Sequence, residues 1–214
     1  MRFINALSYK YANSLTKELG HSHEKKRVYY YGFQIVIGGI VKTAVLVLLT
    51  LLLGIFQSTL TVIAFFAVPR IFAGGYHMDN YTRCMITSLG IFLGLGLLVK
   101  YTYLYWGSGM LITLSVLTFL AALVSAIKWA PADTPYKPIT NPQKIKRLKT
   151  ISVIVVILWA AANSILIYNK LPYYILAGCL GMLMAAFIIS PAGYGFFDFI
   201  SGKSRKSKDA HISG

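Results

Sequence analysis

Acidic side chains are scarce in this sequence, which has six Asp and Glu residues against 21 Lys and Arg residues. Such a basic excess is typical of proteins that bind nucleic acids or anionic membrane surfaces. The basic residues gather in short polar stretches and at the termini, between long apolar segments. This distribution favours membrane orientation and contact with anionic lipids, so we expect no nucleic-acid partner.

Cysteine is also scarce, because only Cys84 and Cys179 are present. The sequence has no zinc-type spacing and no phosphate-binding loop, so we expect no metal and no cofactor. It also lacks the Gly-x-Ser-x-Gly and His-Glu-x-x-His motifs of other protease classes. Cys179 lies in an apolar run, where most cysteines are inert. We therefore expect no disulfide between the two.

Long apolar segments dominate the chain: 57% of its 214 residues are hydrophobic, 13% are charged, and the mean hydropathy is +0.64. This composition predicts an all-α integral membrane protein rather than a soluble domain. Residues 1–19 contain no continuous apolar core and no small-residue cleavage site, so we expect no signal peptide.

Six apolar segments are candidate transmembrane helices: residues 33–56, 58–69, 84–105, 109–130, 151–168 and 173–191. The second would cover only about 18 Å as a helix, against a membrane core of roughly 30 Å. It therefore either extends through Phe72, ends among other helices, or is re-entrant. Fusing the first two segments gives a weaker five-span alternative. In the third segment, Gly90, Gly94 and Gly96 predict close helix packing.

The N-terminal segment, residues 1–32, has apolar residues every four positions among basic ones, at Phe3, Leu7, Tyr11 and Leu15. This pattern predicts an amphipathic helix that lies on the membrane surface. The expected organisation is this segment, a membrane domain over residues 33–192 with polar loops at 70–83 and 131–150, and a basic tail over residues 193–214.

The charge distribution predicts the orientation. With six spans, residues 1–32, 70–83, 131–150 and 193–214 lie on one side and hold six, two, five and four Lys and Arg residues. The connections on the other side hold one, Lys170. Basic loops stay in the cytoplasm, so both termini and both polar loops are expected there.

Residues 70–84 form a polar island that concentrates backbone-permissive and reactive residues: Arg70, Gly74, Gly75, His77, Asp79 and Cys84. One interpretation is an ordinary turn between helices. The other is a nucleophilic site, in which His77 takes the thiol proton of Cys84. Capping at Asp79 or Asn80 would put Cys84 about one turn inside the next helix, where the helix dipole stabilises an anion.

The remaining candidates support this site. Gly74 and Gly75 permit a chain break and could offer backbone N–H groups to an oxyanion. Asp79 could orient His77 or simply cap the helix, and Asp133 is a second candidate carboxylate.

The spacing Arg-x3-Gly-Gly-x-His-x6-Cys, from Arg70 to Cys84, resembles the signature of the accessory gene regulator B (AgrB) family. The resemblance includes the chain length, the basic N-terminus, the apolar segments and the Pro- and Lys-rich loop. It implies a cysteine endopeptidase of the bacterial cell membrane, with Cys84 as nucleophile and His77 as base. It also implies a short AgrD-like precursor peptide, and closure of a thiolactone or lactone ring from a Cys84 thioester to give a cyclic autoinducing peptide for quorum sensing.

Further expectations concern substrate and assembly. Arg70 and the basic residues Lys144, Lys146 and Arg147 are candidates for binding an acidic part or the C-terminal carboxylate of the precursor. A homodimer is a further candidate assembly. Two other functions stay open: a small transporter or channel component, which would use Lys42 within the first apolar segment, and a non-enzymatic membrane scaffold. Neither explains the Gly-Gly-x-His-x6-Cys spacing.

Overall fold

The computed structural model describes residues 2–20, 22–76, 78, 80–132 and 141–202. These residues form helices joined by short connections, with one isolated bridge between Gly74 and Ala132. The predicted all-α class is therefore confirmed. The chain divides into two compact units, Met1–Gly54 and Ile55–Gly214.

The first unit is a helix pair, α1 (Arg2–Glu18) and α2 (His23–Leu52). Lys26 joins the two helices, because its Nζ lies 2.8 Å from Asn13 Oδ1 and 4.3 Å from the centre of the Tyr9 ring. Phe3 and Tyr11 stay exposed on α1. The location of this helix on a membrane surface stays a prediction. The second helix begins at His23 instead of Phe33, so it includes residues assigned to the surface segment.

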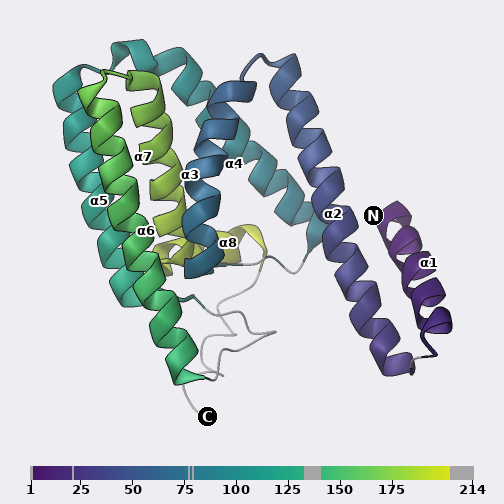
Figure 1. Ribbon diagram of the computed structural model, residues 1–214. Helices are drawn as coiled ribbons and strands as arrows, with labels where there is room; N and C mark the ends of the chain where they lie inside the picture. Colours follow the sequence, from purple (N-terminus) through teal and green to yellow (C-terminus); the bar gives the residue numbers. More distant parts are fainter. Residues whose placement is uncertain (1, 21, 77, 79, 133–140, 203–214) are drawn as a thin grey trace. The chain divides into compact units, whose positions relative to one another are not determined.

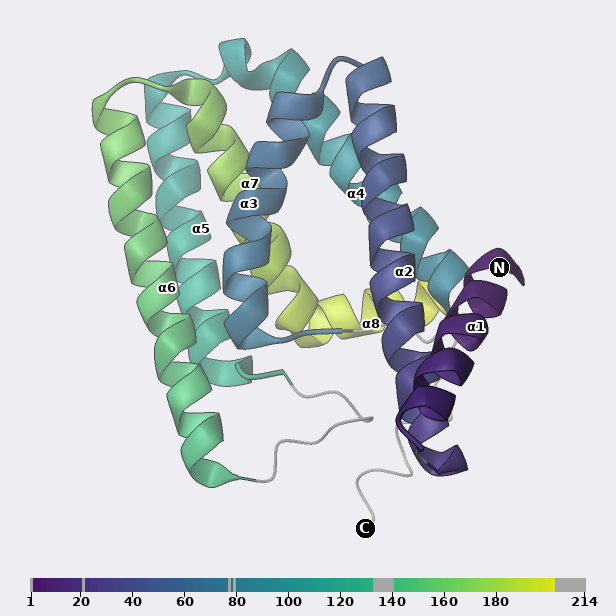
Figure 2. The ribbon, with the colours of Figure 1, turned by 45° about the vertical axis from the view of Figure 1, so that its right-hand side comes forward.

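The second unit contains the other helices: α3 (Phe56–Ala73), α4 (Tyr81–Thr102), the short η1 (Tyr103–Tyr105), α5 (Ser108–Trp129), α6 (Pro142–Tyr168), α7 (Pro172–Ile189) and α8 (Pro191–Ile200). Helix α7 contacts each of α3 to α6 and is the most buried of the long helices. Figures 1 and 2 show it between α3 and the α5–α6 pair. It therefore forms the centre of this unit.

Glycines allow α3 to approach its neighbours closely. A Cβ at Gly181 of α7 would collide with the Val62 carbonyl of α3, and one at Gly96 of α4 would collide with Thr59. Small residues at such contacts are the usual means of close packing in membranes. Gly90 and Gly94 face open space instead. Three glycines of α4 were expected to mediate packing. Of these three, Gly96 alone makes a close contact with another helix.

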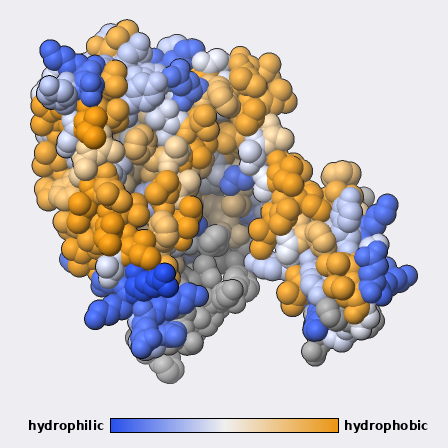
Figure 3. Space-filling view, viewed as in Figure 1, coloured by the Kyte–Doolittle hydropathy of each residue, from blue (hydrophilic) through white to orange (hydrophobic). Residues whose placement is uncertain are grey.

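Among the described residues, six helices, α2 to α7, are long and apolar enough to cross a membrane, which indicates a multi-pass membrane protein. Helix α3 runs without a break from Phe56 to Ala73 and is separate from α2. The first two apolar segments therefore form two helices and not one, and the second is a continuous helix. Figure 3 shows hydrophobic surface along the helices and a hydrophilic patch at the start of α6.

Two helix starts correct the predicted boundaries. Helix α6 begins at Pro142, within the polar loop expected over residues 131–150, because the Asn141 side chain caps it by accepting from the N–H groups of Gln143 and Lys144. Helix α8 occupies the start of the expected tail. Ser190 caps it by accepting from the Gly193 N–H at 3.1 Å, and Figure 2 shows α8 lying across the end of α7.

Candidate functional site

The candidate site begins where α3 ends. Gly74 caps this helix with a positive φ of 71°, and its N–H donates to the Arg70 carbonyl at 3.1 Å. Ala132, from the connection after α5, donates its N–H to the Ala73 carbonyl at 2.7 Å. A Cβ at Gly74 would collide with the Ala132 carbonyl oxygen. Glycine is therefore required here both for the backbone angle and for the close approach of a second chain segment.

Arg70 holds the next residues of the loop. Its Nη1 donates to the Gly74 carbonyl at 2.8 Å, and its Nη2 donates to the Tyr76 carbonyl at 2.7 Å. A guanidinium suits this role, because its planar fork presents several donors in fixed directions. The loop between α3 and α4 is thus organised around an arginine from the last turn of α3.

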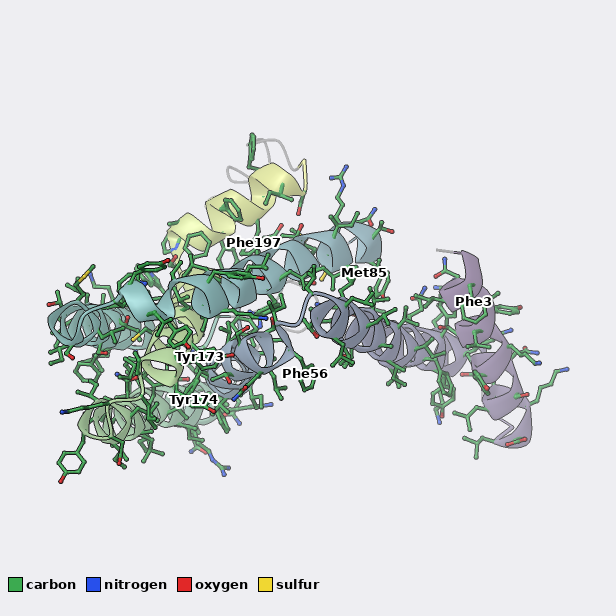
Figure 4. The ribbon with its side chains drawn as sticks, turned by 90° about the horizontal axis from the view of Figure 1, so that it is seen from above. Phe3, Phe56, Met85, Tyr173, Tyr174 and Phe197 are labelled. Carbon is green, nitrogen blue, oxygen red and sulfur yellow. The ribbon has the colours of Figure 1, made fainter. Side chains whose placement is uncertain are left out.

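Tyr76 anchors the loop to the C-terminal helix. Its side chain is buried, stacks on Phe197 with ring centres 5.4 Å apart, and meets Tyr194 edge-on at 5.3 Å. The hydroxyl donates to Asp198 Oδ1 at 2.9 Å and lies 3.3 Å from Ser201 Oγ. Figure 4 looks down on this region, with Phe197 on α8 and Met85 at the start of α4.

Cys84 lies in the first turn of α4. Asn80 is the N-cap, since its Oδ1 accepts from the N–H groups of Thr82 at 2.9 Å and Arg83 at 3.3 Å. The Cys84 N–H then donates to the Asn80 carbonyl at 2.9 Å. The expectation that Asn80 would place Cys84 about one turn inside a helix is confirmed. The residue is half-buried, which is compatible with a reactive thiol.

The backbone N–H groups of the first turn form the positive end of α4, and Cys84 lies within that turn. The positive end of a helix favours a nearby negative charge. Nucleophilic cysteines are commonly found in such positions.

The remaining expected site residues fall into two groups. His77, Asp79 and Asp133 lie outside the described residues. Lys144, Lys146 and Arg147 are exposed on the first turns of α6 rather than in a loop. Cys179 lies elsewhere, buried in α7 with its sulfur 3.5 Å from Ser115 Oγ, and both cysteines are free thiols.

The geometry also bears on the expected oxyanion donors. The Gly74 N–H already donates within the helix cap, so its use by a substrate would require the loss of that bond. The amide of Tyr76 donates to the Ile188 carbonyl at 3.3 Å. Gly75 has no room for a side chain, because a Cβ there would collide with Arg70 Nη1. The position of the glycines is explained by packing and backbone angle.

Several residues of the site were not found from the sequence: Tyr76, Arg83, Asp198 and Ser201. Their partners come from segments more than a hundred residues apart in the chain, and a single sequence carries no signal for such pairs. The start of α8, in contrast, did carry a signal in the sequence. Ser190 followed by Pro191 is a typical helix N-terminus, with a capping hydroxyl and proline at the first helical position.

Comparison with known proteins gives a consistent result. Residues 8–189 match the model of the family described as Accessory gene regulator B. An accessory gene regulator protein B of Staphylococcus aureus is 28% identical over 89% of this chain and 96% of its own length. The corresponding protein of Staphylococcus saprophyticus is 30% identical over 72% of this chain and 77% of its own length.

A protein described as AgrB-like, from Clostridium perfringens, is 25% identical over 78% of this chain and 80% of its own length. No solved structure matches the chain significantly. The family match covers the last turn of α3, the loop after it and the first turn of α4, where the candidate site lies. Since it extends over most of the sequence, the chain belongs to the accessory gene regulator B (AgrB) family.

Proposed function

We propose that this protein is a membrane cysteine endopeptidase that cleaves a short precursor peptide through a thioester on Cys84. The observation that carries the proposal is the position of Cys84 in the first turn of α4, which the Asn80 side chain caps. Membership of the AgrB family implies a role in the accessory gene regulator system. The proposal adds the chemistry that the site performs.

The first step activates the nucleophile. A free thiol is mostly protonated at neutral pH, and the thiolate is the attacking species. His77 precedes Cys84 by seven positions and takes the thiol proton. The N-terminus of α4 stabilises the resulting anion. Its N–H groups are fixed in place before the reaction begins, and such preorganised dipoles are effective.

The second step forms the intermediate. The Cys84 sulfur attacks the carbonyl carbon of the scissile peptide bond, and the C–N bond breaks as His77 returns the proton to the leaving amine. The N-terminal part of the precursor stays bound as a thioester. An internal thiol or hydroxyl of the peptide then attacks the thioester carbonyl, which closes a thiolactone or lactone ring and releases Cys84. A thioester keeps the acyl group reactive, provided that water is kept out.

Substrate binding involves the basic groups near the cytoplasmic face. The exposed cations at the start of α6, Lys144, Lys146 and Arg147, bind an acidic part of the precursor. Arg70 is assigned a part in the same binding step, in addition to its contacts with the loop carbonyls. The basic N-terminal helix contacts anionic lipids. The termini and the site face the cytoplasm of a bacterial cell.

The test is co-expression with a candidate precursor peptide that contains an internal Cys or Ser. Wild type should shorten the peptide, and Cys84→Ala should not. A transporter would move the precursor without shortening it, and a scaffold would do neither. Cys84-dependent shortening therefore separates the peptidase from both alternatives, and shortening at an unchanged rate in Cys84→Ala would disprove the proposal.

A further inference from the structure

The C-terminal end of α8 contacts both chain segments that lead into the candidate catalytic pair. On one side it binds Tyr76, the residue before His77. On the other side it contacts Arg83, the residue before Cys84. The Arg83 guanidinium donates to the Ser201 carbonyl. Part of a loop and a helix cap separate the two segments in the sequence. Because α8 contacts both of them, it provides a common support.

The contact with Tyr76 is specific in position. The stacked Phe197 ring and the edge-on Tyr194 ring hold the tyrosine ring on two sides, while Asp198 accepts from its hydroxyl. Asp198 is the one carboxylate among the described residues from Ile55 onward. A hydrogen bond to a carboxylate is shorter and stronger than one between neutral groups. The loop is therefore fixed at Tyr76, next to His77 in sequence.

The contact with Arg83 fixes the other segment. Arg83 lies in the first turn of α4, and its backbone N–H also donates to the capping Asn80 side chain. The carbonyls at the end of a helix lack partners within that helix. The Ser201 carbonyl, at the C-cap of α8, finds a partner in a cation from α4. The same serine carries the hydroxyl that lies 3.3 Å from the Tyr76 hydroxyl.

We propose that the end of α8, through Asp198 and Ser201, is a positioning element that holds the segments preceding His77 and Cys84 in register for proton transfer. This inference rests on the proposed function. Asp198 and Ser201 act through Tyr76 and Arg83, not on the substrate. Misplacing a reacting group by about 1 Å can cost on the order of a hundredfold in rate, so residues that only position the catalytic pair can have large kinetic effects.

The first test measures cleavage by purified protein in liposomes, with the peptide that the wild type cleaves. Tyr76→Phe keeps the ring stack and removes the hydroxyl, and Asp198→Ala removes its partner. Each should lower kcat by roughly tenfold or more with KM within about twofold. The double variant should be no worse than either single one, because both remove the same bond. The exposed Tyr168→Phe is the matched control.

The second test needs no catalysis. A His77→Cys, Cys179→Ala protein leaves thiols at positions 77 and 84, and copper–phenanthroline oxidises nearby thiols to a disulfide. The internal cross-link should form readily in this background and at least threefold more slowly when Tyr76→Phe or Asp198→Ala is added. Size-exclusion chromatography confirms that each variant is folded.

The two tests separate the inference from the proposed function. If Cys84→Ala is inactive but Tyr76→Phe and Asp198→Ala keep kcat within twofold, the positioning role is overturned and the peptidase stands. If Cys84→Ala cleaves normally, the peptidase fails and the cross-linking rate alone decides the inference. An unchanged cross-linking rate in both variants overturns the positioning role in either case.

Discussion

The guanidinium of Arg70 occupies the space that a side chain at Gly75 would need. A Cβ at Gly75 would collide with Arg70 Nη1 and approach Ile188 Cγ2 to 3.1 Å, and Gly75 has a φ of 130°. The arginine can donate to the Gly74 and Tyr76 carbonyls because nothing projects from the residue between them. The Gly-Gly pair and the arginine four positions earlier are therefore one structural unit.

Gly75→Ala should disrupt this unit. The new methyl group must displace Arg70, and a non-glycine residue in a sparsely populated backbone region costs about 1–3 kcal/mol. We expect a lower midpoint of thermal unfolding in detergent and a loss of precursor cleavage. Gly90→Ala is the control, because Gly90 lies in α4 with open space around it and alanine favours helices. Equal behaviour of the two variants would contradict this account of the Gly-Gly pair.

Arg70→Lys tests the two-carbonyl contact. An ammonium is a compact charge without the planar fork of a guanidinium, so lysine keeps the positive charge but holds the loop poorly. We expect cleavage to fall by about tenfold or more, since a hydrogen bond to a charged group is worth about 1.5–3 kcal/mol. Arg70→Ala should be worse, because it also removes the charge. The exposed Arg27→Lys change should have little effect, and equal activity of Arg70→Lys and wild type would refute the role.

Neutralising Lys144, Lys146 and Arg147 together to Gln should weaken precursor processing and make it less sensitive to salt. Salt screens interactions between exposed charges, so a binding step that depends on them weakens as ionic strength rises. The measurement is the cleavage rate over a series of NaCl concentrations. The residues are exposed on α6, so the fold should tolerate the change.

The control for that prediction neutralises three exposed basic residues of the first unit, Lys10, Lys17 and Lys25. It changes the net charge equally without altering the start of α6. If both triple variants show the same rate and the same salt dependence as wild type, with equal amounts of inserted protein, the α6 cations serve orientation alone.

The charge distribution predicts that residues 1, 140 and 214 are cytoplasmic. In a background without native cysteines, Thr140→Cys and Gly214→Cys should react with a membrane-impermeant maleimide only after the cells are opened. Ser108 lies at the start of α5, the end of the helix away from position 140, so Ser108→Cys should react in intact cells. Labelling of position 140 from outside would reverse the orientation and move the candidate site to the outer face.

Most of the fold could be predicted from the sequence, because a membrane span is a local signal. A stretch of apolar residues indicates a helix regardless of what it packs against, and a long helix contains each of the six predicted segments or most of it. The errors concern helix boundaries. Helix α2 begins ten residues before the predicted span. Asn141 and Ser190 begin helices in polar or mixed segments, where hydropathy carries no information and a single side chain decides the start.

The candidate site was predicted in part for the same reason. The capped helix start before Cys84 is local and was found. The contacts of Tyr76 with Asp198 and of Arg83 with Ser201 join residues 122 and 118 positions apart. They depend on the path of α7 and α8, which no local pattern determines. The prediction for Arg70 was also incomplete, because it did not include the hydrogen bonds to the loop carbonyls. Any residue supplies a backbone carbonyl, so the sequence gives no signal for such bonds.

The proposed catalytic pair leads to a set of matched substitutions. Cys84→Ala, His77→Ala and the double variant should all abolish cleavage to nearly the same extent, because groups that act together are non-additive. Cys84→Ser should also fail, since a hydroxyl ionises far less readily than a thiol. Cys179→Ala should retain activity, because Cys179 is buried in α7. Iodoacetamide should alkylate Cys84 more slowly at neutral pH in His77→Ala, and equally fast at high pH, where solvent removes the proton.

The most direct measurement is intact-mass spectrometry of the protein during precursor cleavage, after rapid denaturation in acid. The account predicts an added mass equal to the N-terminal part of the precursor, attached at Cys84, released by neutral hydroxylamine and absent from Cys84→Ala. A cleaved precursor with no such adduct at any time, together with an unchanged cleavage rate in Cys84→Ala, would contradict it.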